Sequence, residues 1–289
     1  MIDIIDWKRK GEFFTYEGHN IFYLNEGQGE TLLLIHGFPT SSWDWCKVWE
    51  SLTKAYQVIA IDMIGFGYSD KPQDYVYSMF DQSNLIESLL SQIEVKGVHI
   101  LAHDYGDTVA QELLHKHNHK ELTFNINSCV LLNGGLFHGV HKPRLVQKLL
   151  LTPFGPLIQK FYTKDKFAKT FHNIFGKNSP PTTVEIESFW ELMNHNGGRK
   201  IFNKLIRYLV ERKEYQERWL KALQNFEAPL RLIDGVADPI SGQHLVDHYV
   251  SVIPNADVIE LDNIGHYPQT EAWEDVLKHY DDFRKRIST

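Results

Sequence analysis

The sequence places an aspartate where a catalytic nucleophile would be expected. Asp104 follows an apolar run at residues 97–101 and precedes a helix-like stretch at residues 108–114. Ala102 and Gly106 flank it two positions away, and a nucleophile between small residues at a strand-to-helix junction is typical of the nucleophile elbow, a sharp turn that lifts one side chain off the backbone. A carboxylate acylates poorly, but it can displace a leaving group at saturated carbon and form an ester that water then hydrolyses. The residue type therefore predicts hydrolysis through an alkyl-enzyme ester.

Such a nucleophile needs a base that activates water and an acid that orients the base. Asp238 lies just past a predicted strand at residues 230–233, and His266 lies on the loop after another at residues 258–261. When a nucleophile elbow is part of an α/β sheet, the nucleophile, the acid and the histidine are expected in this chain order. We therefore predict a triad of Asp104, Asp238 and His266.

The ester carbonyl also needs donors for the oxyanion that forms during hydrolysis. The backbone N–H groups of Phe38 and Tyr105 are the candidates, because the loop after the first parallel strand and the residue after the nucleophile supply these donors. Two alternatives stay open. Asp104 could instead cap the following helix, and Asp234 competes with Asp238 as the acid, although it lies inside the strand pattern.

A metal site is a weaker interpretation. His115, His117 and His119 lie close together in sequence, but residues two apart on a helix face different sides, so only His115 and His119 could converge. We expect no metal and no organic cofactor.

The elements that must position these residues follow an α/β pattern. Two short segments, 13–16 and 21–24, predict a hairpin. Four apolar runs without polar alternation then predict strands that are buried on both faces of a parallel sheet, at residues 31–35, 57–61, 98–102 and 128–132. Helical patterns separate them, at residues 43–52, 80–93 and 109–117. With the two later strands, the pattern predicts a mostly parallel, doubly wound, eight-stranded sheet.

The strand–helix alternation stops for about 90 residues in the middle of the chain. Residues 136–226 have a helical pattern interrupted by prolines, and an amphipathic helix at residues 272–286 ends the chain. We predict a core of residues 1–135 and 227–289 with a helical cap at 136–226. Such a cap would cover the carboxyl ends of the strands, where open α/β sheets bind ligands.

Composition limits the partners. The chain has 289 residues and a net charge of −7, which argues against nucleic acid. The two cysteines are far apart, the first residues lack a signal-peptide layout, and no run approaches the roughly 18 apolar residues of a membrane span. We therefore expect a cytoplasmic protein without a membrane span that acts on a small molecule, as a monomer or a dimer.

Four motifs in order carry a family resemblance. They lie at residues 36–39, 62–72, 103–106 and 265–268. Together they resemble the epoxide hydrolase and haloalkane dehalogenase branch of the α/β-hydrolase superfamily, and the chain is most similar to its mesoderm-specific transcript group. The resemblance implies the α/β-hydrolase fold with a helical cap.

The departures from that branch bear on the substrate. Haloalkane dehalogenases usually hold the halide with a tryptophan after the nucleophile or an asparagine after the first His-Gly, where this chain has Tyr105 and Phe38. Epoxide hydrolases use cap tyrosines as proton donors. The candidate leaving-group residues here are Tyr162, Tyr208 and Tyr215, with Trp190 as a halide-donor candidate. Tyr208 and Tyr215 lie seven residues apart, which is two helical turns, so they could share one face of a helix. We expect epoxide hydrolysis ahead of dehalogenation. A binding protein without catalysis is the remaining alternative, and the complete triad argues against it.

Overall fold

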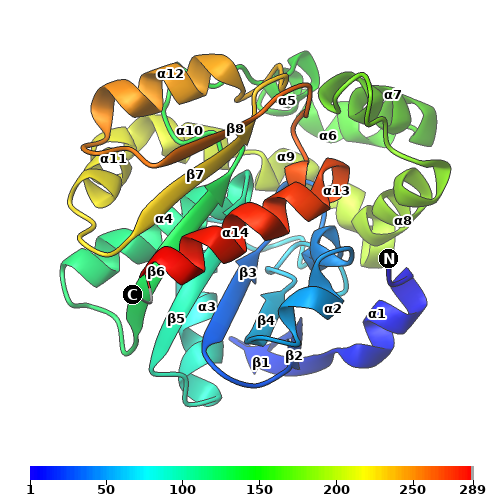
Figure 1. Ribbon diagram of the computed structural model, residues 1–289. Helices are drawn as coiled ribbons and strands as arrows, with labels where there is room; N and C mark the ends of the chain where they lie inside the picture. Colours follow the sequence, from blue (N-terminus) through cyan, green and yellow to red (C-terminus); the bar gives the residue numbers. More distant parts are fainter. Residues whose placement is uncertain (288–289) are drawn as a thin grey trace.

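The protein is built on one eight-stranded sheet, which the computed structural model describes together with the rest of residues 1–287. The strand order is β1-β2-β4-β3-β5-β6-β7-β8. Pairs β1–β2 and β2–β4 are antiparallel and the others are parallel, which confirms the predicted fold class (Figure 1). The strands are β1 Glu12–Tyr16, β2 His19–Glu26, β3 Thr31–Ile35, β4 Gln57–Ile61, β5 Gly97–His103, β6 Asn125–Leu132, β7 Leu230–Gly235 and β8 Val258–Leu261.

The central strands are buried because helices cover both faces of the sheet. All five residues of β3 are buried, as are six of the seven in β5, so the runs without polar alternation behave as predicted. In Figure 1, α14 crosses in front of the sheet while α3 and α4 lie behind it. The core helices are α1 Ile4–Lys10, α2 Trp49–Leu52, α3 Met79–Gln92, α4 Tyr105–Asn118, α12 Gln243–Val252, α13 Pro268–Glu271 and α14 Trp273–Ile287.

Three local features differ from the sequence prediction. The helix predicted at residues 43–52 is a 3₁₀ turn at Ser42–Trp45 followed by the short α2. The indole of Trp43 in that turn donates to Ile2 O and is buried, so tertiary contacts set the local geometry. Helices α1 and α12 were not predicted. Asp3 caps α1 by accepting from the N–H groups of Ile5 and Asp6.

The cap segment between β6 and β7 is helical. Its helices are α5 Leu145–Leu150, α6 Gly155–Lys160, α7 Lys164–Ile174, α8 Thr183–Asn194, α9 Phe202–Leu205, α10 Tyr208–Glu214 and α11 Gln216–Gln224, with a 3₁₀ segment at His195–Ile201. In Figure 1 the helices α5 to α9 lie beyond the carboxyl ends of the strands. Helix α11 instead packs against α4 of the core. None of the helices in residues 1–287 is long and apolar enough to cross a membrane.

Candidate active site

The turn between β5 and α4 holds Asp104 in a strained conformation. Its backbone angles are φ 49° and ψ −103°, which few residues with a Cβ adopt. The small residue at Gly106 is required, because a Cβ there would lie 2.5 Å from the carbonyl oxygen of Ile35. The Asp104 side chain makes no capping hydrogen bond to α4, so the helix-cap alternative is wrong. Its Oδ2 accepts instead from the N–H of Phe38 at 3.0 Å.

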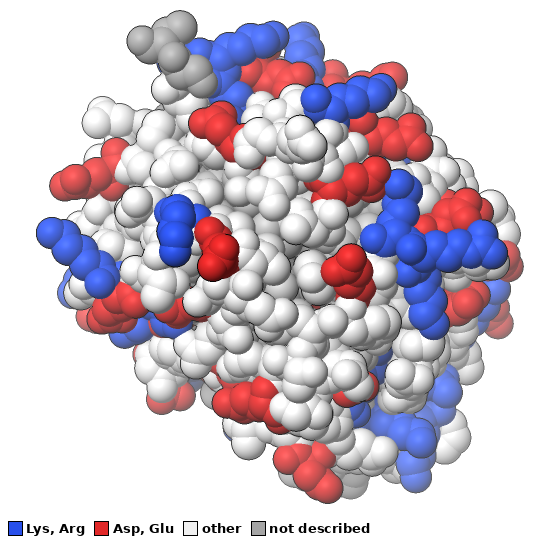
Figure 2. All heavy atoms as spheres, turned by 90° about the horizontal axis from the view of Figure 1, so that it is seen from below, with Lys and Arg blue, Asp and Glu red and all other residues white. Residues whose placement is uncertain are grey.

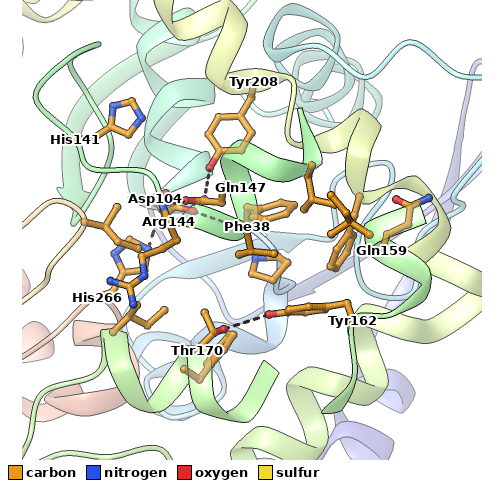
Figure 3. A pocket seen from close by; sticks show the side chains of 18 of the residues that line it. Phe38, Asp104, His141, Arg144, Gln147, Gln159, Tyr162, Thr170, Tyr208 and His266 are labelled. Carbon is orange, nitrogen blue, oxygen red and sulfur yellow. Dashed lines mark hydrogen bonds and ion pairs between the residues drawn. The ribbon is translucent and has the colours of Figure 1, made fainter. Parts of the chain in front are cut away.

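The predicted acid and base are in direct contact. His266 Nδ1 donates to Asp238 Oδ2 at 2.7 Å, and His266 Nε2 lies 4.0 Å from Asp104 Oδ1. All three side chains are buried. Figure 3 shows the imidazole of His266 turned toward Asp104. The structure therefore brings these three residues together in the order Asp104, His266, Asp238.

The carboxylate of Asp238 is held by four further hydrogen bonds. Oδ1 accepts from the N–H of Ile240 at 2.7 Å. Oδ2 accepts from the N–H and hydroxyl of Ser241 at 3.1 and 2.8 Å and from Asn133 Nδ2 at 3.2 Å. Burial opposes ionisation, but the charge of His266 and these hydrogen bonds outweigh it and lower the pKa of Asp238. Asp238 is therefore ionised at neutral pH and fixes the tautomer of His266.

The competing acid, Asp234, lies in a different environment. It accepts from Asn133 Nδ2 at 3.3 Å and has no hydrogen bond to His266. Burial and the nearby charge of Asp238 raise the pKa of Asp234 well above its usual value. An acid that does not contact the imidazole cannot orient it, so the geometry favours Asp238.

His266 is charged in the resting site. Burial alone would lower its pKa, but the charge and hydrogen bond of Asp238 and the charge of Asp104 raise it to about 9. Two carboxylates thus stabilise one imidazolium. Any step that neutralises Asp104 removes part of that stabilisation and releases the imidazole as a base.

The two predicted oxyanion donors flank the nucleophile. The N–H of Phe38 already points at Asp104, as described above. Tyr105 is the first residue of α4, and the first N–H groups of a helix have no acceptor within it. Its ring is buried between those of Phe66 and Tyr208, 5.2 and 5.0 Å away between centroids, which fixes the start of the helix.

A cavity of about 60 Å³ lies above these groups and is lined mostly by apolar side chains. Two predicted cap residues, Tyr162 and Tyr208, are part of its wall. Tyr208 OH accepts from Gln147 Nε2 at 3.4 Å, and Tyr162 OH donates to Thr170 Oγ1 at 3.5 Å. In Figure 3 the hydroxyl of Tyr208 meets Gln147, while Tyr162 lies across the cavity with its hydroxyl at Thr170.

The other two predicted cap residues do not line the cavity. Tyr208 and Tyr215 were expected to share a helix face, but α10 ends at Glu214, so the helical spacing does not hold across both residues. Tyr215 packs against Phe80, with ring centroids 4.7 Å apart. Trp190 packs behind Tyr162, at 6.5 Å between ring centroids. Neither residue has a place at the reacting atoms.

Arg212 was not predicted and lies beside Asp104. It is buried on α10, where Nη2 donates to the carbonyl of Asp104 at 3.0 Å and Nε donates to Thr108 Oγ1 at 2.7 Å. Nη2 also lies 3.9 Å from Asp104 Oδ1, and the guanidinium stacks 4.5 Å from the ring centre of Tyr208. The i, i+4 spacing from Tyr208 was visible in the sequence, but nothing there showed that this face of α10 meets the elbow.

The histidines of α4 do not form a metal site. The rings of His115 and His119 stack with centroids 4.1 Å apart, and His119 Nδ1 donates to the carbonyl of its partner. Within residues 1–287 no group of three His, Cys, Asp or Glu side chains is placed to hold a metal ion.

The sheet, the elbow and the Asp–His pair together define an α/β hydrolase. Residues 30–272 match the family described as alpha/beta hydrolase fold, and the chain belongs to this family. Over 280 residues it is 39% identical to the mesoderm-specific transcript protein of Mus musculus, covering 92% of this chain and 83% of that protein. The predicted likeness to the mesoderm-specific transcript group is therefore confirmed.

Solved structures with the same fold include two enzymes of the predicted branch. A haloalkane dehalogenase variant, DbeA-M1, from Bradyrhizobium elkanii has a TM-score of 0.80 at 18% identity, covering 96% of this chain and 97% of that one. The epoxide hydrolase CorEH has a TM-score of 0.77 at 18% identity, covering 96% and 99%. At this identity the likeness concerns the fold alone.

Proposed function

We propose that this hydrolase uses Asp104 as its nucleophile on small, largely apolar electrophiles, with epoxides preferred to haloalkanes. The observation that carries the proposal is a carboxylate, and no hydroxyl or thiol, in the strained elbow turn. Its Oδ2 is held by the N–H of Phe38, whereas Oδ1 has no hydrogen bond and lies about 4 Å from both His266 Nε2 and Arg212 Nη2. The free oxygen is the one available for attack.

In the first step Asp104 Oδ1 forms a bond to an epoxide carbon and the carbon–oxygen bond of the ring breaks. The departing oxygen takes a proton from a cap tyrosine. Tyr208 is the better placed of the two, because its ring stacks on the guanidinium of Arg212, which lies 3.9 Å from Asp104 Oδ1. Burial and the Asp104 charge raise its pKa, while Arg212 acts in the opposite direction. The stacked guanidinium thus stabilises the phenolate that proton transfer leaves.

In the second step water hydrolyses the ester. Once Asp104 is esterified, its negative charge no longer supports the imidazolium of His266, so the pKa of His266 falls. The imidazolium then returns a proton through water to the Tyr208 phenolate, and the neutral Nε2 can accept a proton from the attacking water. The hydroxide attacks the Asp104 carbonyl carbon, and the N–H groups of Phe38 and Tyr105 stabilise the oxyanion. The diol leaves and the carboxylate is restored.

Dehalogenation is the second candidate, and Arg212 favours it. The side chains of Phe38 and Tyr105 offer no N–H to a halide, and Trp190 does not line the cavity. The buried guanidinium of Arg212, however, lines the same cavity and is a cation that a departing halide could approach. The non-catalytic alternative accounts neither for the strained Asp104 nor for the bonded Asp238–His266 pair.

A panel of small epoxides and chain-matched haloalkanes tests the proposal. Diol formation from at least one epoxide, faster than halide release from its haloalkane counterpart, is the expected result, and Asp104→Asn should abolish it. Rapid halide release with no diol from any epoxide would show that the dehalogenase assignment is correct. Turnover of neither class, with carboxylic esters hydrolysed instead, would overturn the proposal.

A further inference from the structure

Exposed apolar side chains gather on two neighbouring cap helices. On α5, Leu145 and Leu149 are 72% and 41% exposed and lie four residues apart, so they share a helix face. On and beside α6, three more share a face at spacings of three and four residues: Phe154, Leu157 and Phe161, between 52% and 69% exposed. Helices α5 and α6 pack against each other (Figure 1). We name these five residues the α5–α6 face.

Positive charge surrounds the α5–α6 face. Residues 142–169 contain seven lysines and arginines and a single acid, although the whole chain has a net charge of −7. The basic residues are Lys142, Arg144, Lys148, Lys160, Lys164, Lys166 and Lys169. Lys164 is paired with Glu187 at 2.9 Å, so the positive charge around the face comes from the other six. On the opposite end of the molecule, seen in Figure 2, positive and negative side chains are scattered among one another.

The fold places cations beside the apolar side chains. Lys142 and Arg144 line one surface hollow together with Leu145 and Leu149. The ammonium of Lys166 donates to the carbonyl oxygen of Phe161 at 3.1 Å, which holds a positive charge at the far end of the face. Exposed leucine and phenylalanine rimmed by lysine is the pattern of segments that lie in a membrane interface.

We propose that the α5–α6 face docks on the surface of an anionic lipid bilayer. The leucines and phenylalanines would enter the boundary of the acyl chains while the surrounding lysines contact the phosphate and carboxylate headgroups. The acidic remainder of the chain is repelled by such a surface, so the charge asymmetry orients the cap toward it. This binding needs no membrane-spanning helix and is reversible.

The same helices connect this surface to the cavity. The inner sides of α5 and α6 line the cavity with Leu150 and Ile158, while Arg144, Val146 and Thr170 line both the cavity and the surface hollow. Docking would therefore bring a thin wall of the apolar cavity against the lipid. Delivery of apolar substrates from the bilayer is a consequence that rests on the proposed function, whereas the docking itself does not.

Co-sedimentation with lipid vesicles tests the docking without any substrate. The protein should bind vesicles of phosphatidylcholine containing phosphatidylserine, bind pure phosphatidylcholine much more weakly, and dissociate as salt is raised. Phe154→Ser with Phe161→Ser should reduce binding at least tenfold. Lys148→Glu with Lys160→Glu should reduce it at least about 25-fold, since each lysine near an anionic surface contributes roughly fivefold.

Matched controls lie elsewhere on the surface. Val76→Ser with Val250→Ser removes exposed apolar side chains outside the cap. Lys54→Glu with Lys278→Glu alters the net charge by the same amount as the lysine pair in the cap. Both control pairs should bind vesicles like the wild type. Absence of binding to anionic vesicles would overturn the proposal, as would equal loss in the control pairs. A concentration-dependent dimer in light scattering that Phe154→Ser abolishes, without vesicle binding, would show that a second copy covers the face instead.

Discussion

The pKa of His266 should depend on the charge of Asp104, and Asp104→Asn tests this dependence. Asparagine has nearly the shape of the carboxylate and, like the proposed ester, carries no charge. It therefore imitates the electrostatics of the covalent intermediate without any substrate. In the wild type the imidazole is 4.0 Å from Asp104 Oδ1 and has a pKa of about 9.

The size of the expected shift follows from that distance. Two unit charges 4.0 Å apart interact by about 1 kcal/mol in a water-like dielectric and by about 4 kcal/mol at an effective dielectric of about 20. One pKa unit corresponds to about 1.4 kcal/mol, so the loss of the Asp104 charge should lower the pKa of His266 by roughly 1 to 3 units. The variant histidine would then titrate between roughly 6 and 8, where it can act as a base.

An NMR titration of the His266 ring protons measures both values. Asp234→Asn is the control, since burial raises the pKa of that acid and it has no hydrogen bond to His266, and it should leave the pKa of His266 unchanged. The same pKa in wild type and Asp104→Asn would refute the reasoning that ester formation releases the base.

The raised pKa also predicts how stability depends on pH. The folded-state pKa of His266, about 9, lies above its usual value of 6.5, so its contribution is fully present below about pH 6.5 and is lost as the pH rises through 9. In urea denaturation the wild type should lose more stability between pH 6 and 10 than Asp104→Asn does. An equal loss in both proteins would contradict this assignment.

The remaining predictions concern the neighbours of the triad. Asp238→Asn should lower turnover by roughly 10³–10⁴-fold in steady-state assays, because it removes the charge that fixes the tautomer of His266. Asp234→Asn should change turnover little. If Asp234→Asn lowered turnover more than Asp238→Asn, Asp234 would be the acid of the triad. Tyr208→Phe should slow diol formation by raising its activation free energy by up to about 3 kcal/mol. Tyr215 lies outside the cavity, so Tyr215→Phe should not slow diol formation. Arg212→Met should cost roughly 3 kcal/mol in the free energy of unfolding measured with urea. It removes buried hydrogen bonds to the Asp104 carbonyl and Thr108 and leaves His266 as the remaining cation beside the Asp104 carboxylate. A neutral result would mean that Arg212 does not stabilise the site.

The sequence was sufficient to predict the sheet and the convergence of Asp104, Asp238 and His266 at one edge of it. Each follows a parallel strand, and the carboxyl ends of parallel strands lie along one edge of a sheet, so chain order alone predicts that such side chains converge. The strands were recognisable because their burial on both faces leaves long apolar runs. The catalytic roles of these three residues stay predictions until they are measured.

The cap could not be predicted to the same depth, because its residues reach the site through tertiary packing. The seven-residue spacing of Tyr208 and Tyr215 has meaning only within one helix, and α10 ends between them. Arg212 reaches the elbow because α10 lies against the start of α4, a contact without a periodic signal in the sequence. Trp190 was a candidate by residue type alone, and Tyr162 stands between it and the cavity.

Intact-mass analysis of His266→Gln detects the covalent intermediate itself. The variant retains Asp104 but lacks the base for water, so under single-turnover conditions with a competent epoxide it should accumulate an adduct of the substrate's mass on the peptide that contains Asp104. The wild type should show the adduct only transiently, and Asp104→Asn should show none. If His266→Gln consumes the substrate and no adduct forms on Asp104, the alkyl-enzyme ester is not an intermediate and the account is wrong.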